Sequence, residues 1–456
     1  MKNIQRKKIL IAGLGRSGMA AARLLSAQGA DVYGFDGKAE DVFPVEDIRE
    51  LENLDVHCFF GREPDIFDFV QVVASPGMPL TAPVLANASR KGVEIIGELE
   101  LAYRSRPSAF VAITGTNGKT TTTALVGEMY RLAGMPHRIV GNIGMPVADQ
   151  ILTAEAEAVM VTEVSSFQLE TIVDFRPHVA AILNITPDHL DRHGRLEEYI
   201  RIKFRIFENQ VEGDYCIYNA DDAICAGLSD SAMKGNAIPF SARGPLVIGA
   251  YVEDERILIA GKGSARTDLC GVKDLKIPGA HNLENALAAA ATAFFAGVPT
   301  VAIREALCTF GGVEHRIESV ARINGVAYIN DSKGTNPDAA IKAIQAVSSP
   351  LLLIAGGYEK NADFDPFTAA FEGRVQHLLL LGETAQRIAQ SARTNGFPES
   401  SIHFCRDMAQ CVAEAARLAR PGDAVLLSPA CASWGMYNNF EERGRHFKEL
   451  VHALEK

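Results

Sequence analysis

A short glycine-rich turn carries the residues of this sequence that are best suited to bind phosphate. Residues 115–120 read Gly-Thr-Asn-Gly-Lys-Thr and directly follow the apolar run 110–113. A strand that turns sharply into a helix directs several backbone N–H groups and the helix N-terminus at one point, which suits a polyphosphate. Lys119 can reach the outer phosphates, and the Thr120 hydroxyl can ligate Mg²⁺. We therefore predict a nucleoside triphosphate site with the contacts Gly115, Thr116, Asn117, Gly118, Lys119, Thr120 and Thr121.

The turn also has a plainer interpretation, because it does not complete the general P-loop pattern. The pattern G-x-x-x-x-G-K-[ST] requires glycine at position 113, where this chain has Ile113. A glycine-rich turn of any α/β domain is therefore the alternative. Gly-Lys-Thr after a buried strand is otherwise uncommon, and this favours the nucleotide.

Two further positions are suited to hold a metal ion near that turn. Glu163 ends the apolar run 158–162, and a carboxylate at a strand end beside bound phosphate suits Mg²⁺. The alternative is that Glu163 only interacts with the dipole of the following helix. Residues 186–193 contain two His and two Asp, of which His189 is the best candidate to bind metal or phosphate. A capped loop with solvated charges is the alternative there.

Several other residues are chemically capable but less distinctive in their local pattern. Lys203 lies among bulky neighbours and reads as a lysine whose stem covers a surface helix. Asn282 and Asn285 share a helix face and can contact adenine, ribose or phosphate, although Asn282 is equally suited to cap the helix. Arg316 lies at a block boundary, and residues 330–337 combine acid, base and hydroxyl in one turn. An Arg and an Asp that close over the phosphate turn from another domain would exclude water from phosphoryl transfer.

The elements that would position these groups begin with a strand–helix–strand unit. A buried-strand pattern over 8–12 leads into Gly13-x-Gly15-x-x-Gly18 and a helix over 19–29, and a second strand ends at Asp36. Glycines and an acidic residue at this spacing form the dinucleotide fingerprint and, taken alone, predict NAD or FAD. The geometry requires only a diphosphate on a helix N-terminus, so the fingerprint does not identify the nucleotide.

Alternating strands and helices divide the chain into three blocks, which we predict to be domains over 1–97, 98–312 and 313–456. The alternation predicts an α/β fold with mostly parallel sheets covered on both faces. We expect a Rossmann-like N-terminal domain, a central P-loop ATPase-like domain and a Rossmann-like C-terminal domain. Strands of the third block are expected at 327–330, 351–354, 378–381 and 424–427.

Length, charge and cysteine spacing exclude several classes of protein. A chain of 456 residues is too long for one ordinary core. A net charge of −11 argues against a nucleic-acid partner. The eight cysteines show no C-x-x-C spacing and read as reduced thiols. Without an apolar run that suits a signal peptide or a membrane span, we expect a cytoplasmic protein with no membrane partner.

Taken together, these motifs resemble the Mur ligase family of peptidoglycan synthesis, in the same order and over nearly the whole chain. The resemblance implies a three-domain, ATP-dependent ligase whose domains bind in turn the UDP of a sugar nucleotide, ATP and an amino acid. The discriminating runs are Ser-Pro-Ala-Cys-Ala-Ser at 428–433 and Phe-Glu-Glu-Arg-Gly at 440–444. The Asp-Asn-Pro-Arg motif of the diaminopimelate- or lysine-adding relative does not occur. The resemblance therefore implies addition of D-glutamate to UDP-N-acetylmuramoyl-L-alanine through an acyl phosphate.

The resemblance also implies roles for particular residues, and it replaces the dinucleotide at Gly13–Gly18 by UDP. The implied sugar-nucleotide contacts are Leu14, Arg16, Asp36, Lys38, Ser75, Gly77, Asn142, Gln168 and Tyr199. Besides the glycine-rich turn, the implied ATP contacts are Asn285, Arg316 and Asp331. The implied D-glutamate contacts are Thr335, Lys360, Ser433 and Phe440. The implied catalytic residues are Lys119, His189, Lys203 and Lys333, and the implied Mg²⁺ ligands are Thr120, Glu163, His189 and Lys203.

Lys203 gains a second interpretation from the resemblance, as a lysine that CO₂ converts to a carbamate which helps to organise Mg²⁺. Carbamate formation needs a neutral amine, and a free lysine with a pKa of about 10.4 is roughly one part in a thousand neutral near pH 7.4. Burial would lower that pKa. Trp434-Gly435 departs from the family, whose members often have a smaller apolar residue and then Asp, and this affects the expected shape of the amino-acid site.

Three other classes of protein are kept as alternatives. A folylpolyglutamate synthase-like ligase shares the ATP and C-terminal domains but usually lacks the N-terminal block. A nicotinamide-dependent dehydrogenase is supported only by the fingerprint and Asp36, and leaves residues 115–120 without a role. A non-catalytic P-loop switch protein leaves Lys333 and Lys360 unexplained. For the ligase that the resemblance implies, we expect a monomer.

Overall fold

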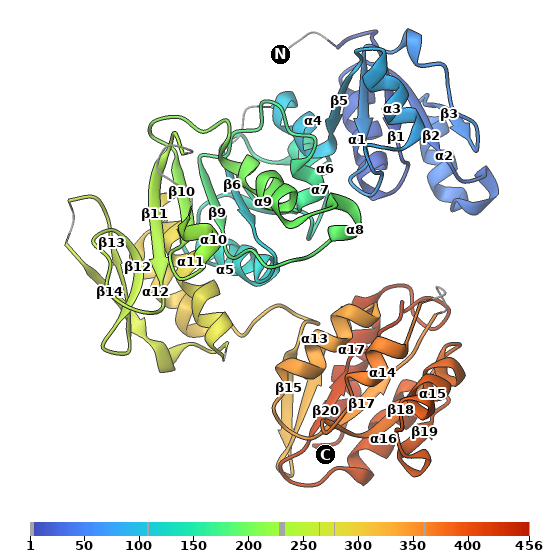
Figure 1. The fold of residues 1–456 in the computed structure, drawn as a ribbon, viewed down its shortest axis with the longest axis vertical. Coiled ribbons are helices and arrows are strands. Elements are labelled where there is room, and N and C mark those ends of the chain that lie inside the picture. The colour runs from blue at the N-terminus through green and yellow to red at the C-terminus, as the bar shows by residue number, and fades with distance from the viewer. Residues whose placement is uncertain are drawn as a thin grey trace. The chain divides into compact units, whose positions relative to one another are not determined.

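The computed structural model describes residues 4–106, 109–227, 233–263, 265–277, 279–358 and 362–455. The chain divides into two compact units, Met1–Phe310 and Gly311–Lys456, which are drawn in Figure 1. Helices alternate with the strands of three mostly parallel sheets. This arrangement confirms the predicted α/β fold class.

The first sheet of the N-terminal unit is parallel throughout and has the order β3-β2-β1-β4-β5. Its strands are β1 (Lys8–Ala12), β2 (Asp31–Asp36), β3 (His57–Phe60), β4 (Gln71–Ala74) and β5 (Glu94–Gly97). Its helices are α1 (Arg16–Ala27), α2 (Val45–Asn53), α3 (Pro83–Arg90) and α4 (Glu98–Ser105). The strand order reverses direction between β1 and β4, and ligands of open α/β sheets bind beyond such a point.

Helix α1 begins three residues before the predicted start at residue 19. Gly18 lies inside its first turn, where a Cβ would overlap the carbonyl oxygen of Gly13. The third glycine of the fingerprint therefore allows α1 to pack closely against the turn at Gly13. The helix starts within the fingerprint and not after it.

The second sheet of this unit has the order β14-β13-β12-β11-β10-β9-β6-β8-β7. Its strands are β6 (Phe110–Thr114), β7 (His137–Gly141), β8 (Val159–Glu163), β9 (Val179–Ile182), β10 (Tyr215–Asn219), β11 (Asn236–Ser241), β12 (Gly249–Glu253), β13 (Arg256–Ala260) and β14 (Thr267–Gly271). Strands β12 to β14 pair antiparallel, and the others pair parallel. Its helices are α5 (Lys119–Leu132), α6 (Val147–Thr153), α7 (Ser166–Leu169), α8 (Leu190–His193), α9 (Leu196–Phe204), α10 (Ala223–Ala226), α11 (Ala280–Phe295) and α12 (Thr300–Thr309).

The two sheets of the N-terminal unit share one apolar layer. Helices α1, α4 and α6 pack against one another, and one continuous core contains Leu25, Leu101 and Ile151. Burial of this layer holds the two sheets together as one compact unit. The domain boundary that we predicted at 97/98 lies between β5 and α4 and stays a prediction, as does the boundary at 312/313.

The C-terminal unit contains the third sheet, in the order β15-β16-β20-β17-β18-β19. Its strands are β15 (Glu318–Ile323), β16 (Val326–Asn330), β17 (Leu351–Ala355), β18 (Val375–Leu380), β19 (Ile402–Phe404) and β20 (Ala424–Leu427). Its helices are α13 (Pro337–Ala346), α14 (Asp365–Ala369), α15 (Ala385–Thr394), α16 (Met408–Leu418) and α17 (Phe440–Ala453). Only the pair β15–β16 is antiparallel among the described strand pairs of this sheet.

Candidate active site

The glycine-rich turn joins β6 to α5, and its glycines are required by its shape. Gly115 and Gly118 have φ angles of +151° and +85°, which favour glycine. A Cβ on Gly118 would also overlap the Oδ1 atom of Asn285 on α11. The turn therefore packs directly against Asn285, which is buried and accepts a hydrogen bond from the Thr122 hydroxyl at 3.5 Å.

Two ammonium groups meet at the end of β6. Lys119 Nζ donates to the carbonyl oxygens of Gly115 and Thr116 at 2.9 and 2.8 Å. Lys203 Nζ donates to the same carbonyl oxygen of Gly115 at 2.9 Å. This arrangement places the positive charge of Lys119 and the amine of Lys203 at the turn where the sequence predicts phosphates.

Lys203 is buried in the N-terminal unit, with 1% of its surface exposed. Its Nζ atom lies 3.4 Å from Thr114 Oγ1 and 4.8 Å from the centre of the Tyr199 ring. Burial, reinforced by the charge of Lys119, holds the pKa of Lys203 well below its usual value. The interpretation of Lys203 as a surface lysine is therefore wrong, because the local helix pattern carries no information on what packs over the ammonium group.

Glu163 ends β8 directly beside β6 and is also buried, with 1% exposure. Its Oε1 atom accepts a hydrogen bond from Asn142 Nδ2 at 2.7 Å. Its Oε2 atom has no hydrogen-bond partner among the described residues. A buried, unpaired carboxylate oxygen destabilises a fold unless a cation meets it. Glu163 therefore fits the predicted role of a Mg²⁺ ligand.

A hollow of about 130 Å³ brings several predicted residues together. It is lined by Lys119, Asn142, Ser165, Ser166, Phe167, Asp188, His189, Tyr199 and Lys203. In the described part of the chain, no three His, Cys, Asp or Glu side chains are grouped to hold a metal by themselves. Mg²⁺ is commonly held by one or two carboxylates together with substrate phosphates. The hollow suits a metal that arrives with a nucleotide.

Ser165, Ser166 and Phe167 of this hollow were not predicted to have a role, and Asp188 was predicted only as a member of the cluster 186–193. Ser165 caps α7, and its side chain and the side chain of Gln168 complete a reciprocal capping box. The Ser-x-x-Gln spacing was a readable signal for this box. Gln168 is thereby held in place, since its Oε1 atom accepts from the Ser165 backbone and hydroxyl at 3.0 Å each.

Tyr199 and His189 both line this hollow but differ in their surroundings. Tyr199 is buried, and its hydroxyl lies 3.2 Å from the hydroxyl of Thr116 in the glycine-rich turn. Burial raises the pKa of Tyr199 to about 12, so it stays protonated at neutral pH. His189 has a φ of +52° and a half-exposed ring 4.9 Å from the ring of Phe167.

Six of the nine residues predicted to bind the sugar nucleotide lie at or just after the carboxyl ends of β1, β2 and β4, whereas Asn142, Gln168 and Tyr199 belong to the second sheet region. Asp36 accepts hydrogen bonds from the backbone of Leu14 at 3.0 Å and of Lys38 at 3.1 Å. A Cβ on Gly13, whose φ is +95°, would come within 2.7 Å of Ser75 Cβ. The Arg16 side chain reaches the Gly144 carbonyl oxygen at 2.8 Å. The turn at Gly13, the Asp36 carboxylate and Ser75 therefore lie together at one end of the first sheet.

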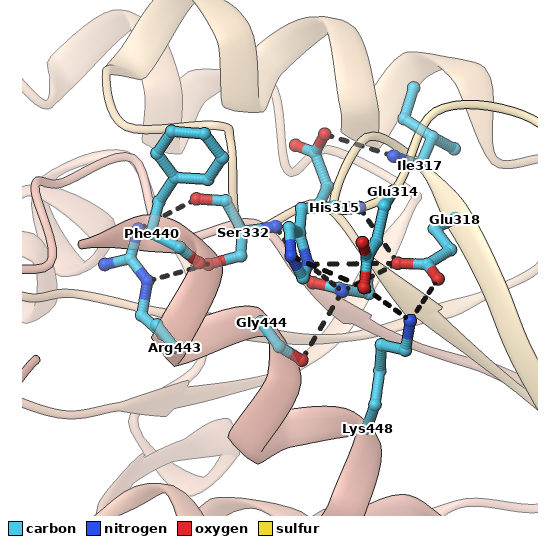
Figure 2. A network of polar contacts seen from close by, with 11 residues as sticks. Glu314, His315, Ile317, Glu318, Ser332, Phe440, Arg443, Gly444 and Lys448 are labelled. Atoms are coloured by element: carbon cyan, nitrogen blue, oxygen red, sulfur yellow. Dashed lines mark hydrogen bonds and ion pairs between the residues drawn. The ribbon is translucent and has the colours of Figure 1, made fainter. Parts of the chain in front are cut away.

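In the C-terminal unit, Asp331 and Ser332 follow β16 and are buried. Figure 2 shows the polar network around Ser332. Asp331 accepts hydrogen bonds from the Ser428 hydroxyl at 2.6 Å and from the Ile317 backbone at 3.3 Å. Burial raises the pKa of Asp331 to about 6. The Ser332 hydroxyl donates to the Phe440 carbonyl oxygen at 2.8 Å. The network therefore joins the turn after β16 to the start of α17.

Three of the four predicted D-glutamate contacts are described residues of the C-terminal unit. Phe440 begins α17, with Lys333 Nζ 6.0 Å from the centre of its ring. Ser433 is buried, and the Thr335 backbone donates to the Lys333 carbonyl oxygen at 2.8 Å. Lys360 lies outside the described residues.

Arg443 is a member of this network and lies within the run 440–444, but no role was predicted for it. It is 2% exposed, and its guanidinium donates to the Ser332 hydroxyl at 3.0 Å, the Ser332 carbonyl oxygen at 2.9 Å and the Cys431 carbonyl oxygen at 3.1 Å. Burial lowers the pKa of Arg443 to about 10. Figure 2 shows this side chain facing Ser332 and Phe440. No local pattern distinguishes a buried arginine from an exposed one on an amphipathic helix, so only the packing reveals it.

His315 is a member of the same network, whereas its neighbour Arg316 is not buried. His315 is buried with a φ of +64°, and its Nδ1 atom lies 2.9 Å from Asn330 Nδ2. A Cβ on Gly444 would overlap the His315 ring, so this glycine lets α17 approach it. Arg316, the predicted ATP contact, is exposed.

A larger hollow of about 1330 Å³ lies elsewhere in the N-terminal unit. Its lining includes Ile4, Tyr103, Arg104, Phe110 and Asp214. None of these five is a predicted site residue. We therefore base the candidate site on the convergence of the glycine-rich turn, Glu163 and Lys203, and not on the size of a cavity.

Comparison with known proteins identifies the family of this chain. The chain matches the MurD-like N-terminal domain of Mur ligases over residues 7–97, the Mur ligase middle domain over 113–293 and the Mur ligase glutamate ligase domain over 315–431. The chain belongs to the Mur ligase family, a class of ATP-dependent carboxylate–amine ligases.

Two relatives that match over the full length both carry the name UDP-N-acetylmuramoylalanine–D-glutamate ligase. The protein of Thermoanaerobacter sp. (strain X514) is 47% identical, with 99% of each chain covered. The protein of Clostridioides difficile (strain 630) is 44% identical, with 99% of this chain and 100% of the relative covered.

Solved structures of Mur ligases share the fold at lower identity. The ligase MurC of Thermotoga maritima has a TM-score of 0.55 and 20% identity, with 98% of this chain and 99% of that chain covered. MurF of Acinetobacter baumannii has a TM-score of 0.56 and 19% identity, with 93% and 91% covered. Among the described residues, no helix is both long and apolar enough to cross a membrane.

Proposed function

We propose that this protein joins D-glutamate to the carboxyl group of UDP-N-acetylmuramoyl-L-alanine with ATP, a cytoplasmic step of peptidoglycan synthesis. The observation that carries the chemistry is the convergence of Lys119, Lys203 and the unpaired Glu163 oxygen around one glycine-rich turn. The names of the full-length relatives support the two substrates. A monomer would suffice, because every proposed contact lies on this chain.

The reaction proceeds in two balanced steps. The muramyl carboxylate attacks the γ-phosphorus of ATP, which forms an acyl phosphate and releases ADP. The amine of D-glutamate then attacks the acyl carbon, loses a proton, and expels phosphate from the tetrahedral intermediate. Transfer of a phosphoryl group between two anions depends mainly on positioning and on neutralising charge.

The residues of the N-terminal unit divide these tasks. Lys119 and the N-terminus of α5 hold the ATP phosphates, and Asn285 fixes the nucleotide from α11. Thr120, Glu163, His189 and a carbamate on Lys203 would hold Mg²⁺, which when bound neutralises charge on the transferred phosphoryl group. The hydrogen bonds of Asp36 and Gln168 keep their loops in place around the sugar nucleotide. The sugar-nucleotide contacts proposed are Leu14, Arg16, Asp36, Lys38, Ser75, Gly77, Asn142, Gln168 and Tyr199.

The remaining proposed contacts belong to the C-terminal unit. Arg316 and Asp331 would contact ATP, and Lys333 would neutralise the acyl substrate. Thr335, Lys360, Ser433 and Phe440 would contact D-glutamate. The buried network of Ser332 and Arg443 supports this assignment, because it fixes the turn after β16 against the start of α17.

Carboxylation of Lys203 is part of this proposal. The neutral amine would attack CO₂ and release one proton, and the depressed pKa of Lys203 favours the neutral amine. Lys203→Ala should lower the rate of phosphate release at least a thousandfold, and short carboxylic acids should partly restore it. The exposed Lys234→Ala is the matched control. Full activity of Lys203→Ala would exclude the role.

Substrate dependence tests the function as a whole. Phosphate release from ATP should require both UDP-N-acetylmuramoyl-L-alanine and D-glutamate. L-Glutamate in place of D-glutamate should give no more than background release. Equal release with L-glutamate, or release with the amino acid omitted, would contradict the proposal.

A further inference from the structure

One arginine of the N-terminal unit connects the loop after β4 to the small hollow. Arg192 lies on α8, and its side chain is 13% exposed. Its Nη2 atom donates to the carbonyl oxygen of Met78 at 3.2 Å, and its Nη1 atom to that of Gly77 at a weaker 3.5 Å. Both carbonyls belong to the loop 75–82 between β4 and α3, which also carries Ser75. The side chain thus crosses from the second sheet to the first.

The guanidinium of Arg192 is fixed on its other side by the second sheet. Glu170 accepts two hydrogen bonds from it, at 2.6 and 3.2 Å. The Phe167 ring lies under the guanidinium, with its centre 4.3 Å from Arg192 Cζ. Phe167 also contacts His189, at 4.9 Å between ring centres. Planar, bidentate and stacked contacts of this kind need arginine and are not reproduced by lysine.

We propose that Arg192 is a positioning residue for the ligation, which holds loop 75–82 against the hollow that contains His189. It touches no reacting atom. It acts by fixing the carbonyls of Gly77 and Met78, and so fixes the sugar nucleotide relative to the glycine-rich turn. This inference rests on the proposed function, because it takes loop 75–82 as part of the sugar-nucleotide site.

Arg192→Met tests this role in the full-length enzyme, because methionine keeps an apolar stem over Phe167 and removes every donor. The KM for UDP-N-acetylmuramoyl-L-alanine should rise at least tenfold. The KM values for ATP and D-glutamate should stay within twofold. Arg201→Met is the matched control, since Arg201 pairs only with Glu198 among the described residues and is 63% exposed. A purely structural role would instead lower the active fraction and leave all three KM values unchanged.

A second measurement needs no substrate and is independent of the proposed function. Backbone amides of residues 75–82 should exchange with deuterium at least fivefold faster in Arg192→Met than in the wild type or in Arg201→Met. Arg192→Lys, which keeps the charge, should show smaller changes in both measurements. It also serves as the test variant where Arg192→Met does not fold.

The outcomes separate this inference from the proposed function. An unchanged exchange rate in loop 75–82, or equal increases in all three KM values, would overturn the role of Arg192. Faster exchange together with a selective rise in the sugar-nucleotide KM would support it. A wild-type enzyme that releases no phosphate with all three substrates would contradict the proposed function, while the exchange measurement would still decide whether Arg192 holds the loop.

Discussion

Glu163 and Lys203 are ionisable residues whose burial does not stabilise the fold. Each is 1% exposed. The Glu163 Oε2 atom has no partner among the described residues, and the pKa of Lys203 is held far below its usual value by burial. Burial of charge destabilises a fold, so such positions are candidates for chemistry. Both residues border the glycine-rich turn, which is where a metal and phosphates would compensate for their burial.

Glu163→Gln should separate activity from stability. Phosphate release should fall at least a hundredfold, because an amide is a poor ligand for Mg²⁺. The melting temperature without nucleotide should change little, since the wild type already leaves one buried polar atom of this side chain unpaired. Activity assays and thermal unfolding measure the two effects, with the exposed Glu157→Gln as the control. A variant that loses stability but keeps its activity per folded molecule would refute the metal role.

Asp331 should make the stability of the C-terminal unit depend on pH. Its pKa is raised by burial to about 6 in the folded protein, from 3.8. The folded protein therefore holds this proton more tightly, and the free energy of unfolding should fall as pH rises from about 4 to about 6. A shift of this size corresponds to roughly 3 kcal/mol at most. Above about pH 6 the loss should be complete.

The comparison of wild type with Asp331→Asn isolates this contribution from other titrating groups. Thermal unfolding of both proteins between pH 4.5 and 7.5 gives the difference in stability at each pH. That difference should move in favour of Asp331→Asn as pH rises, and then level off. A difference that is constant across this range would show that Asp331 does not titrate there.

The start of α5 can pack closely against the first turns of α11 because the residue at position 118 is glycine, which has no side chain. Gly118 has a φ of +85°, and a Cβ there would overlap Asn285 Oδ1. The glycine therefore serves two purposes, the left-handed turn and the close approach of α11. Both are needed for the N-terminus of α5 to face the site where the phosphates are proposed to bind.

Gly118→Ala and Gly134→Ala should separate these two purposes. Gly134 also has a positive φ, +65°, but a Cβ there would meet no atom within 4 Å. Gly134→Ala should therefore cost about 1 kcal/mol of stability from backbone strain alone and leave the KM for ATP unchanged. Gly118→Ala should destabilise more and raise the KM for ATP at least tenfold. Equal effects of the two substitutions in unfolding and kinetic assays would contradict the close-approach argument.

The whole molecule consists of two compact units, each with its own apolar core. The continuous core with Leu25, Leu101 and Ile151 lies within Met1–Phe310, and the cores around β17 and α17 lie within Gly311–Lys456. Each unit therefore buries its own apolar surface. The proposed sugar-nucleotide contacts all belong to the first unit, and the proposed D-glutamate contacts all belong to the second.

A fragment of residues 1–310 should bind the sugar nucleotide but not ligate it. Its Kd for UDP-N-acetylmuramoyl-L-alanine, measured by calorimetry, should lie within about threefold of the value for the full chain. Phosphate release with all substrates should be at background, because Asp331 and Lys333 are missing. Loss of binding in a folded fragment would show that the second unit contributes to the sugar-nucleotide site.

Much of the fold follows from patterns that are local in the chain. Apolar runs such as 110–113 and 351–354 became β6 and β17, because a run of apolar residues is buried on both faces of a parallel sheet. The glycine-rich turn was equally readable, since glycines at this spacing after an apolar run suit the positive φ angles that the turn adopts. The resemblance to a known family then assigned roles that no spacing could supply.

Local sequence patterns were enough to predict the strongly apolar strands, such as β6 and β17, and the glycine-rich turn at residues 115–120, because backbone sterics and apolar periodicity act over a few residues. They missed less apolar strands at sheet edges, such as β15 and β19. Which side chains are buried away from water depends on the tertiary structure. It buried Lys203 and Arg443, left one oxygen of Glu163 unpaired, and brought Arg192 to the loop after β4. These environments depend on residues tens of positions away, so the free energy of each charge is set by packing that no local pattern encodes.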